Sequence, residues 1–416
     1  SFLQLSFDEK YHLESSHKCY MENMKDDFPP ELYNYSKYND FMKGDGIVYL
    51  GGTKYYQLVL LLIKTLRDMG SMLPVEILIP SKEEYDYTFC NDIFPNFNAQ
   101  CKIMNEYMPD SMIKTVTGFQ LKNIAILISS FQRILYLDLD NLPLRNVDSY
   151  FVNPPFTNNK MVIWPDMWRR STLPDFYSIA GIKVDANNRT RNSYFAQDPK
   201  GTGDVKSFHD CDGTIPEASL ETGQLIIDKK VHIKTLLLAM YYNFYGPDYF
   251  YPLLSQGAAG EGDKETFVAA AHKLGLPYYQ VQEFTREFGP HNDWNTRQYF
   301  AMGQYDPIID YIQSSHDNDK DSDFKTRLKK FNQNIAHINY FSSTKPVFAA
   351  NEKDHTRNNY KYHLFRSLQL AFLHANGPKL KAKEFFVDNS KGRGPVEGSR
   401  RRRIYTKDLI NELGGY

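Results

Sequence analysis

From residue 46 onward, short apolar runs alternate with amphipathic segments. Residues 47–50 form an apolar run that predicts a strand, and the segment after it has apolar side chains spaced for a helix, at positions 55, 58, 59, 62, 66 and 69. A second strand is predicted at 75–79, and a helix at 119–130 precedes a strand at 134–137. This alternation predicts an α/β protein with a mostly parallel central sheet flanked by helices.

The pattern is less regular in the second half of the chain. Residues 150–220 are rich in Pro, Asn, Asp, Gly and Trp, which predicts long loops over the carboxyl edge of the sheet, where α/β proteins bind ligands. Regular elements are predicted again further on, in this order: a strand at 225–227, helices at 232–245 and 264–274, a strand at 336–340 and a helix at about 360–373.

The composition is that of an ordinary globular protein with room for a large core. Of the 416 residues, 42% are hydrophobic and 24% are charged. Aromatic residues make up 15%, which suits a core and a sugar-binding surface equally well. The formal net charge of −1 gives the protein no field that attracts nucleic acid, so nucleic-acid binding is not expected.

No run of the chain approaches the ~20 apolar residues that span a bilayer. The chain begins at Ser1 without an initiator Met or a signal pattern, and we expect a native membrane anchor or targeting segment to be missing from it. The cysteines are Cys19, Cys90, Cys101 and Cys211, and the absence of a C-x-x-C pair disfavours a zinc site. Their even number leaves open two disulfides or free buried thiols.

Two carboxylates, Asp138 and Asp140, follow the predicted strand at 134–137. Both can emerge where the strand meets the loop above the sheet, and Mg²⁺ or Mn²⁺ takes one or two carboxylates together with diphosphate oxygens. The motif therefore predicts a divalent-cation site, with two solvated acids at a turn as the alternative. Aspartate-nucleophile phosphatases also carry a D-x-D after a strand, but Leu142 stands where their pattern has Thr or Val.

Longer motifs carry a family resemblance: GFQLK at 118–122, SSF at 129–131, LDLDNLP at 137–143, WPDMW at 164–168, ETGQ at 221–224, YYN at 241–243 and QGAAGEGDKETF at 256–267. They resemble the fungal Golgi α-mannosyltransferases of the MNN family, over about residues 44 to 380. The residues at 73–76 and the block at 241–267 are most similar to the α-1,2 branch-initiating members. The α-1,3 members share much of that block, so they remain an alternative.

The resemblance implies a GT-A-like nucleotide-sugar transferase fold and a type II membrane protein of the Golgi lumen. It implies retaining transfer of mannose from GDP-mannose, with Mn²⁺ as cofactor, to α-mannan side chains of N-glycans, by α-1,2 branch initiation on an α-1,6 backbone. Complexes with other mannosyltransferases are expected as well. A catalytically silent mannan-binding scaffold is the competing hypothesis, and the presence of Asp138, Asp140, Asp263 and His374 favours an enzyme.

Together, the pattern and the resemblance predict three regions. Residues 1–44 are expected to form a stem or N-terminal wrap, residues 45–385 the glycosyltransferase catalytic domain, and residues 386–416 a basic C-terminal tail.

A remoter resemblance to glycogenin-like retaining transferases concerns the segment at 374–379. Those enzymes carry a C-terminal His-x-x-Gly-x-x-Lys element, and this chain has one residue fewer before its lysine. The resemblance implies His374 as a third metal ligand beside Asp138 and Asp140, and Lys379 as a cation for the diphosphate. Without it, a histidine at the end of a helix is more often a C-cap that interacts with the helix dipole.

The remaining candidate residues divide into a nucleotide group and a sugar group. Nucleotide contacts are predicted for Lys122, Asp138, Lys379, Gly51, Gly52 and Tyr55, although a solvated lysine, turn-forming glycines and a core tyrosine are the alternatives. Catalytic roles on the sugar face opposite the leaving group are predicted for Asp263, Glu221 and Gln224, because a carboxylate or amide there supports an oxocarbenium-like transition state. Sugar or acceptor contacts are predicted for Trp164, Asp166, Trp168, Glu261 and Lys264.

Two points stay open at this stage. Asp263 is also a good residue to N-cap the helix that follows it. Retention through a covalent mannosyl-enzyme is the alternative to same-face attack, in which the departing phosphate takes the acceptor proton, and we favour same-face attack.

Overall fold

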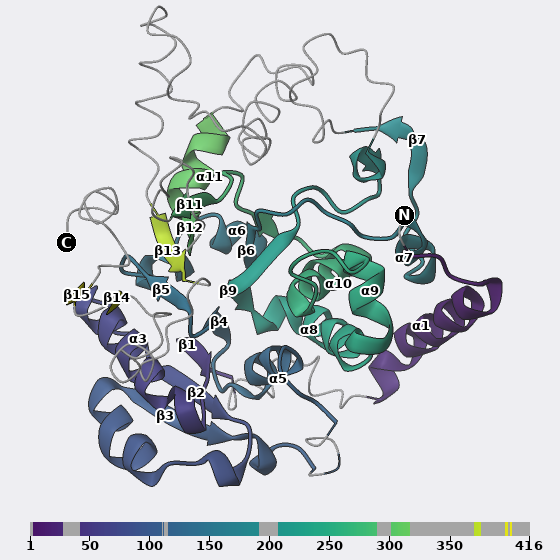
Figure 1. Cartoon of the computed structure of the whole chain (residues 1–416). Helices are drawn as coiled ribbons and strands as arrows, with labels where there is room; N and C mark the ends of the chain where they lie inside the picture. Colours follow the sequence, from purple (N-terminus) through teal and green to yellow (C-terminus); the bar gives the residue numbers. More distant parts are fainter. Residues whose placement is uncertain are drawn as a thin grey trace, which may run out of the picture.

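The structure is a computed structural model that describes residues 3–27, 42–109, 111, 115–190, 207–288, 301–316 and 370–375, together with short strands at 396–397 and 400–401. At its centre is a seven-stranded sheet (Figure 1). Its strands follow each other in the order β10 (Tyr279–Gln280), β6 (Met161–Pro165), β9 (Leu220–Asp228), β4 (Arg133–Leu137), β1 (Asp45–Leu50), β2 (Val75–Ile79) and β3 (Ala99–Ile103).

Most neighbouring strands of this sheet are parallel. β1 pairs in parallel with β2 and β4, β2 with β3, and β10 with β6, whereas β9 runs antiparallel to both β4 and β6. The ends of β1 and β4 therefore open at one carboxyl edge. The predicted α/β class, with a mostly parallel sheet flanked by helices, is confirmed.

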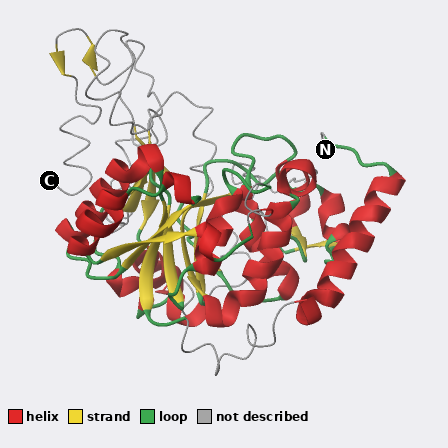
Figure 2. Cartoon of the chain, turned by 90° about the horizontal axis from the view of Figure 1, so that it is seen from below, coloured by secondary structure: helices red, strands yellow, loops and turns green. Residues whose placement is uncertain are grey.

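Helices cover both faces of the sheet because the strand side chains alternate between two apolar cores. Val48 and Ile134 face a core that includes side chains of α5 (Gln120–Ile128), α8 (Lys229–Phe244) and α10 (Thr266–Leu274). Ile47 and Leu135 face the opposite core, which includes side chains of α3 (Tyr56–Asp68). The turned view shows the strands between the two layers of helices (Figure 2). Both faces are thus buried, as expected for parallel strands.

A second, four-stranded antiparallel sheet adjoins the carboxyl edge. Its strands lie in the order β11 (Arg286–Phe288), β12 (Ala301–Tyr305), β13 (Leu370–His374) and β5 (Asn141–Pro143). β5 begins directly after the D-x-D motif, so this sheet brings residues from near position 370 beside that motif. Other described elements include α6 (Phe156–Asn159), α7 (Pro174–Ile179), α9 (Tyr251–Ser255), α11 (Pro307–His316) and the strand pairs β7 (Asp185–Arg189) with β8 (Cys211–Asp212) and β14 (Val396–Glu397) with β15 (Arg400–Arg401).

The sequence predicted the strands at 47–50, 75–79 and 134–137 and the helices that became α3, α5, α8 and α10, and these are confirmed. Two other predictions were wrong. The loop region at 150–220 contains β6, whose residues are all buried. Residues 370–373, predicted as the end of a helix, belong to β13. The strand predicted at 225–227 is confirmed and is longer than predicted, because β9 already begins at Leu220. The strand predicted at 336–340 lies outside the described residues.

The described part of the predicted N-terminal wrap is α1 (Phe7–Asp27), which lies against α7 and α8. His17 Nε2 lies 2.8 Å from the Tyr242 hydroxyl, and Lys10 pairs with Asp175 at 2.8 Å. No described helix is long and apolar enough to cross a membrane. The division of the chain into three regions stays a prediction, and most of the basic tail lies outside the described residues.

One disulfide, Cys90–Cys101, joins the helical turn η4 (Thr88–Ile93) to β3. Cys19 is an exposed free thiol and Cys211 a buried one. The structure thus combines the two alternatives that the cysteine count left open.

Candidate active site

The D-x-D motif lies where β4 ends, beside the polar first half of β9. Antiparallel pairing places Leu137 opposite Gln224, and the Asp138 backbone N–H donates to the Gly223 carbonyl at 2.7 Å. The ETGQ segment therefore runs directly past the two aspartates. Tyr136, the last residue but one of β4, donates its hydroxyl to Asp138 Oδ1 at 2.8 Å.

β13 supplies the histidine of the cluster. Its register places His374 opposite Asn141, and the Ala375 N–H donates to the Asp140 carbonyl at 2.7 Å. His374 Nε2 lies 3.2 Å from Asp140 Oδ1, and its Nδ1 lies 3.4 Å from Glu221 Oε2. Because His374 ends a strand, the alternative role as a helix C-cap is wrong.

Lys122 connects the motif to Asp263. Its ammonium lies 3.4 Å from Asp138 Oδ2 and 3.1 Å from Asp263 Oδ2, and it donates to the carbonyl and hydroxyl of Thr222. The side chain is only 5% exposed, so the alternative of a solvated helix lysine is wrong. Asp263 does not N-cap α10, because its carboxylate is occupied by Lys122 and no side-chain cap is formed at that helix start.

Burial and close charges shift the ionisation of the cluster. Burial alone would lower the pKa of Lys122, but the carboxylates of Asp138, Asp263 and Glu221 outweigh it and raise that pKa, so the lysine stays charged. Burial raises the pKa of Asp263 to about 6, although the ammonium of Lys122 partly opposes the shift.

His374 and Glu221 are a second pair in the cluster whose charges shift each other's pKa. Burial opposes charge on both, but their mutual attraction outweighs it, lowering the pKa of Glu221 to about 2 and raising the pKa of His374 well above its ordinary value. Asp140 adds to the upward shift of the His374 pKa. The imidazole is therefore held as a cation between two carboxylates.

The residues Asp138, Asp140 and His374 have the oxygen and imidazole donors that Mn²⁺ accepts. Asp140 Oδ1 and His374 Nε2 lie 3.2 Å apart, so the carboxylate and the imidazole would both be able to reach one ion. Among the described residues, no group of three or more His, Cys, Asp and Glu side chains is already arranged to hold a metal ion. His374 also has to lose its second proton first, since a ligating imidazole is neutral.

A second buried pair, Asp166 with Lys264, borders the cluster. Lys264 Nζ lies 2.5 Å from Asp166 Oδ2, and burial raises the pKa of Asp166 to about 6 against the opposing charge of Lys264. Gly260 makes room for this ammonium, because a Cβ there would lie 2.6 Å from Lys264 Nζ. The nearby charge of Glu221 adds to the rise of the Asp166 pKa, so the two pairs influence each other.

Two buried polar atoms of the cluster, Asn141 Oδ1 and Gln224 Nε2, have no hydrogen-bond partner among the described residues. Gln224 Oε1 accepts from Asn141 Nδ2, which leaves the Gln224 amide nitrogen as an available donor. An unsatisfied buried polar group costs about 1–3 kcal/mol, so these atoms mark a place that a polar ligand can complete. Sequence reasoning gave no role to Asn141 or Thr222, although both lie inside motifs that it singled out.

Other predicted site residues lie elsewhere or have local roles. Trp164 was expected to contact sugar, and this is wrong: it is fully buried, and its indole N–H donates to the Tyr305 carbonyl at 2.8 Å. Trp168 is 46% exposed and remains a candidate sugar contact. Glu261 accepts from the Gly257 N–H at 2.8 Å and so braces its own loop. Lys379 lies outside the described residues.

The residues after β1 that were predicted to contact the nucleotide lie at the carboxyl edge of the sheet. A Cβ at Gly51 would lie 2.4 Å from Ile77 Cγ2, and Gly52 has a φ of 116°, so local packing and turn geometry account for both glycines. Of two neighbouring tyrosines, one was expected to pack in the core, and Tyr56, at 2% exposure, does so. Tyr55 is 42% exposed, which leaves its ring available to a ligand.

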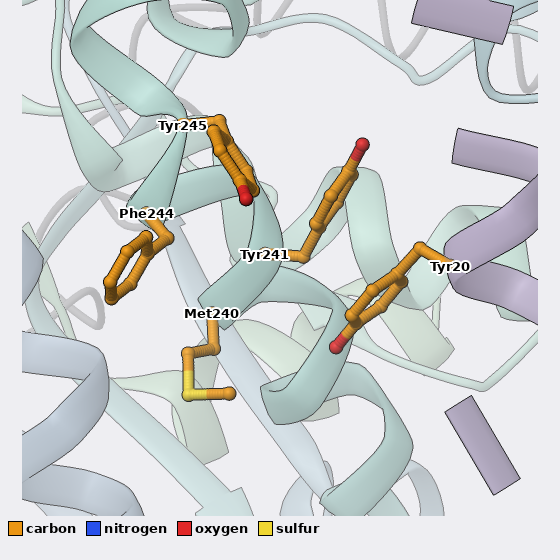
Figure 3. A pocket seen from close by; sticks show the side chains of 5 residues that line it. All are labelled: Tyr20, Met240, Tyr241, Phe244 and Tyr245. Carbon is orange, nitrogen blue, oxygen red and sulfur yellow. The ribbon is translucent and has the colours of Figure 1, made fainter. Parts of the chain in front are cut away.

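A separate hollow of about 240 Å³ lies between α1 and α8. Figure 3 shows Tyr20 from α1 facing four side chains of α8 and its end, Met240, Tyr241, Phe244 and Tyr245. Its lining includes no charged side chain. The charged cluster at the carboxyl edge is therefore the candidate active site.

Comparison with known proteins shows the family of the chain. Residues 44–306 match the protein family described as "Mannosyltransferase putative". The chain belongs to this family. The chain is 55% identical over its whole length to the α-1,2-mannosyltransferase MNN24 of Candida albicans, of which it covers 58%, and 37% identical over 98% of its length to the α-1,2-mannosyltransferase MNN2 of Saccharomyces cerevisiae, of which it covers 68%. The resemblance to the MNN mannosyltransferases, most like the α-1,2 members, is confirmed.

The chain thus spans between half and two thirds of the length of several such relatives, among them 60% of the α-1,2-mannosyltransferase MNN21 of Candida albicans. Solved structures offer only distant likenesses. Mouse xyloside xylosyltransferase 1 has a TM-score of 0.35 at 13% identity, over 57% of this chain and 85% of that one. The glycosyltransferase GlyE of Streptococcus pneumoniae has a TM-score of 0.34 at 11% identity, over 58% and 45%.

Proposed function

We propose that the chain is the catalytic part of a retaining α-mannosyltransferase that takes mannose from GDP-mannose and adds it to α-mannan side chains of N-glycans. The favoured product is an α-1,2 branch on an α-1,6 backbone, in keeping with the names of the relatives. The observation that carries the proposal is the convergence of Asp138, Asp140, His374, Lys122, Glu221 and Asp263 at the carboxyl edge of the sheet. Ligands of open α/β sheets bind at that edge.

In this proposal Asp138, Asp140 and His374 hold a divalent ion, Mn²⁺. When bound, such an ion supplies Lewis-acid stabilisation to the diphosphate that leaves. Lys122 adds a fixed positive charge nearby and holds Asp138 and Asp263 in place from a buried position.

The sugar is assigned to the side of Asp263, Glu221 and Gln224. The bond between mannose C1 and the phosphate oxygen breaks while a bond from C1 to the acceptor oxygen forms on the same face, and the departing phosphate oxygen takes the acceptor proton. Asp263, held 3.1 Å from Lys122, stabilises positive charge that develops on the ring. The free Gln224 N–H is available to donate to a mannose hydroxyl.

The test incubates the protein with GDP-mannose, Mn²⁺ and an α-1,6-mannan acceptor, with and without EDTA. We expect transfer that EDTA abolishes and that Mn²⁺ restores. Linkage analysis of the product then distinguishes an α-1,2 from an α-1,3 bond, and a panel of other nucleotide sugars tests the donor. Binding of mannan without any transfer would favour a silent scaffold.

A single substitution tests the metal-site assignment. We expect Asp140→Ala to abolish transfer without unfolding the protein, because it removes both a proposed metal ligand and the partner of His374. Asp175→Ala is the matched control, since the Asp175 side chain pairs with Lys10 at the surface of α7 and α1, away from the cluster. Unchanged turnover in Asp140→Ala would remove the metal-site assignment.

The proposal also keeps the expected cellular setting, the Golgi lumen and a type II membrane anchor, together with complexes formed with other mannosyltransferases. Localisation and co-purification of the full-length protein in a fungal cell would test these expectations. A cytosolic signal would contradict them without touching the chemistry.

A further inference from the structure

A buried ion pair lies behind the candidate active site. Arg170 lies in the loop between β6 and α7, and Glu265 ends the helical turn η10 (Asp263–Glu265). Arg170 Nη1 contacts Glu265 Oε2, and the two side chains are 0% and 3% exposed. Sequence reasoning gave neither residue a role.

Arg170 binds the chain that leads into β9. Its Nε donates to the Pro216 carbonyl at 2.7 Å, its Nη2 donates to the Ala218 carbonyl at 2.8 Å, and its backbone N–H donates to Glu217 Oε2 at 2.7 Å. The rigid fork of the guanidinium thus fixes Pro216 and Ala218, and the backbone N–H of Arg170 fixes Glu217 between them.

Glu265 binds the start of β9 itself. Its Oε1 accepts from the Ser219 hydroxyl at 2.7 Å and from the Leu220 N–H at 2.9 Å. Leu220 is followed by Glu221, and Glu265 is preceded by Asp263 and Lys264. Glu265 is therefore one or two residues from Lys264 and Asp263, and the Leu220 N–H that it binds belongs to the residue directly before Glu221.

Stability alone explains such a pair poorly. Replacing a buried ion pair with apolar residues of similar volume is often neutral or stabilising, because the charges lose their hydration on burial. The directional contacts of Arg170 and Glu265 instead set the distance between two segments that carry site residues. Displacement of a catalytic group by about 1 Å can slow a reaction about 100-fold.

We propose that Arg170 and Glu265 are positioning residues that hold Asp263 and Lys264 in register with Glu221 and Asp166 during mannosyl transfer. The inference rests on the proposed function for its activity measurements. It assigns the pair no contact with substrate; its effect passes through the two segments that it joins.

The test compares Arg170→Lys with Arg133→Lys. Arg133 forms a similar pair, donating to both oxygens of Asp45 and to the Phe151 carbonyl, but it lies at the opposite, amino edge of the sheet. Lysine cannot reproduce the forked contacts in either place. We expect kcat per folded molecule to fall about 10- to 100-fold in Arg170→Lys, with KM for GDP-mannose changed less than about threefold, and kcat to stay unchanged in Arg133→Lys.

A double variant distinguishes loss of the directional bonds from loss of folding. In Arg170→Met combined with Glu265→Met, apolar contacts replace the charges, so we expect a folded protein. Its kcat should be as low as that of Arg170→Lys, because the directional bonds are absent. Turnover equal to that of the wild type in this double variant would overturn the inference while leaving the proposed function intact.

Amide hydrogen exchange gives a readout that does not need transfer activity. Exchange should accelerate together in residues 216–224 and 261–266 of Arg170→Lys, and in neither segment of Arg133→Lys. Unchanged exchange in both segments would overturn the inference. Absence of transfer in the wild-type protein would instead overturn the proposed function, and the exchange result would still decide whether the pair joins the two segments.

Discussion

Gly223 lies where three side chains of the candidate active site approach the backbone of β9. A Cβ at this position would lie 2.9 Å from Glu221 Oε1, 3.2 Å from Asn141 Nδ2 and 3.4 Å from His374 Cε1. The Gly223 N–H also donates to Glu221 Oε1, and its carbonyl accepts from Asp138. The residue is a glycine because the cluster leaves no space for a methyl group.

We therefore expect Gly223→Ala to reduce kcat by about 10- to 100-fold, since the carboxylate and the imidazole must shift to admit the methyl group. Steady-state kinetics on the folded variant measures the effect. Gly257→Ala is the control: no atom lies within 4 Å of its added Cβ, and the strain of its φ of 71° costs about 1–2 kcal/mol of stability without touching the cluster. Equal kcat in the two variants would contradict the assignment of Gly223.

Among the elements, those in the first half of the chain could be predicted because each shows one clear period. The segment that forms α3 repeats every 3.6 residues, and β1, β2 and β4 are short apolar runs. β6 escaped prediction because its five buried residues lie between segments rich in loop-forming residues. β13 escaped because an apolar run of four residues after a helical pattern does not distinguish a strand from a helix.

The start of β9 shows why part of the site could not be predicted. Residues 221–224 are polar or glycine, so the strand pattern vanishes where the strand meets the candidate active site. Polar residues and a glycine stand there in place of apolar core residues, as happens at functional sites. The D-x-D motif was visible because it follows a regular strand, whereas the contact of Lys122 with Asp263 joins residues that only the packing of α5 brings together.

The disulfide between η4 and β3 gives a prediction for one pair of elements. We expect two free thiols per chain in the denatured, unreduced protein and four after reduction, because only Cys90 and Cys101 are joined. Replacing both with serine should lower the free energy of unfolding by about 2–3 kcal/mol, through the looser unfolded chain. Mannosyl transfer should continue, because β3 is an edge strand of the larger sheet and lies far from the cluster. The strands β4, β1 and β2 separate it from β9. Four free thiols without reductant would contradict the pairing.

At the scale of the whole molecule, buried Glu217 makes stability depend on pH. Burial raises its pKa to about 7, although hydrogen bonding and charge from Arg170 oppose the shift. The folded protein thus holds this proton more tightly than the unfolded chain, whose glutamate has the ordinary pKa of 4.5. The resulting stabilisation is complete below about pH 4.5 and is lost as the pH rises through 7.

Glu217→Gln should remove this dependence. The wild type loses this stabilisation as the pH rises from 5 to 8, whereas the amide cannot ionise. We therefore expect the free energy of unfolding of Glu217→Gln, relative to that of the wild type, to rise by up to about 3 kcal/mol over this pH range. Denaturant unfolding at both pH values measures the change. Glu22→Gln, at a position on α1 where the side chain is 63% exposed, is the control and should follow the wild-type curve. Parallel curves for all three proteins would refute the buried-proton explanation.

The position of β13 makes the cluster depend on a late segment of the described chain. Asp138, Glu221 and Asp263 are synthesised well before Leu370–His374, so a nascent chain can assemble the central sheet while it still lacks the imidazole beside Asp140. A fragment released early, or cut before Leu370, would keep most of the acidic groups but not their histidine. Such a fragment still contains all seven strands of the larger sheet, but its candidate active site stays incomplete because the imidazole beside Asp140 is absent.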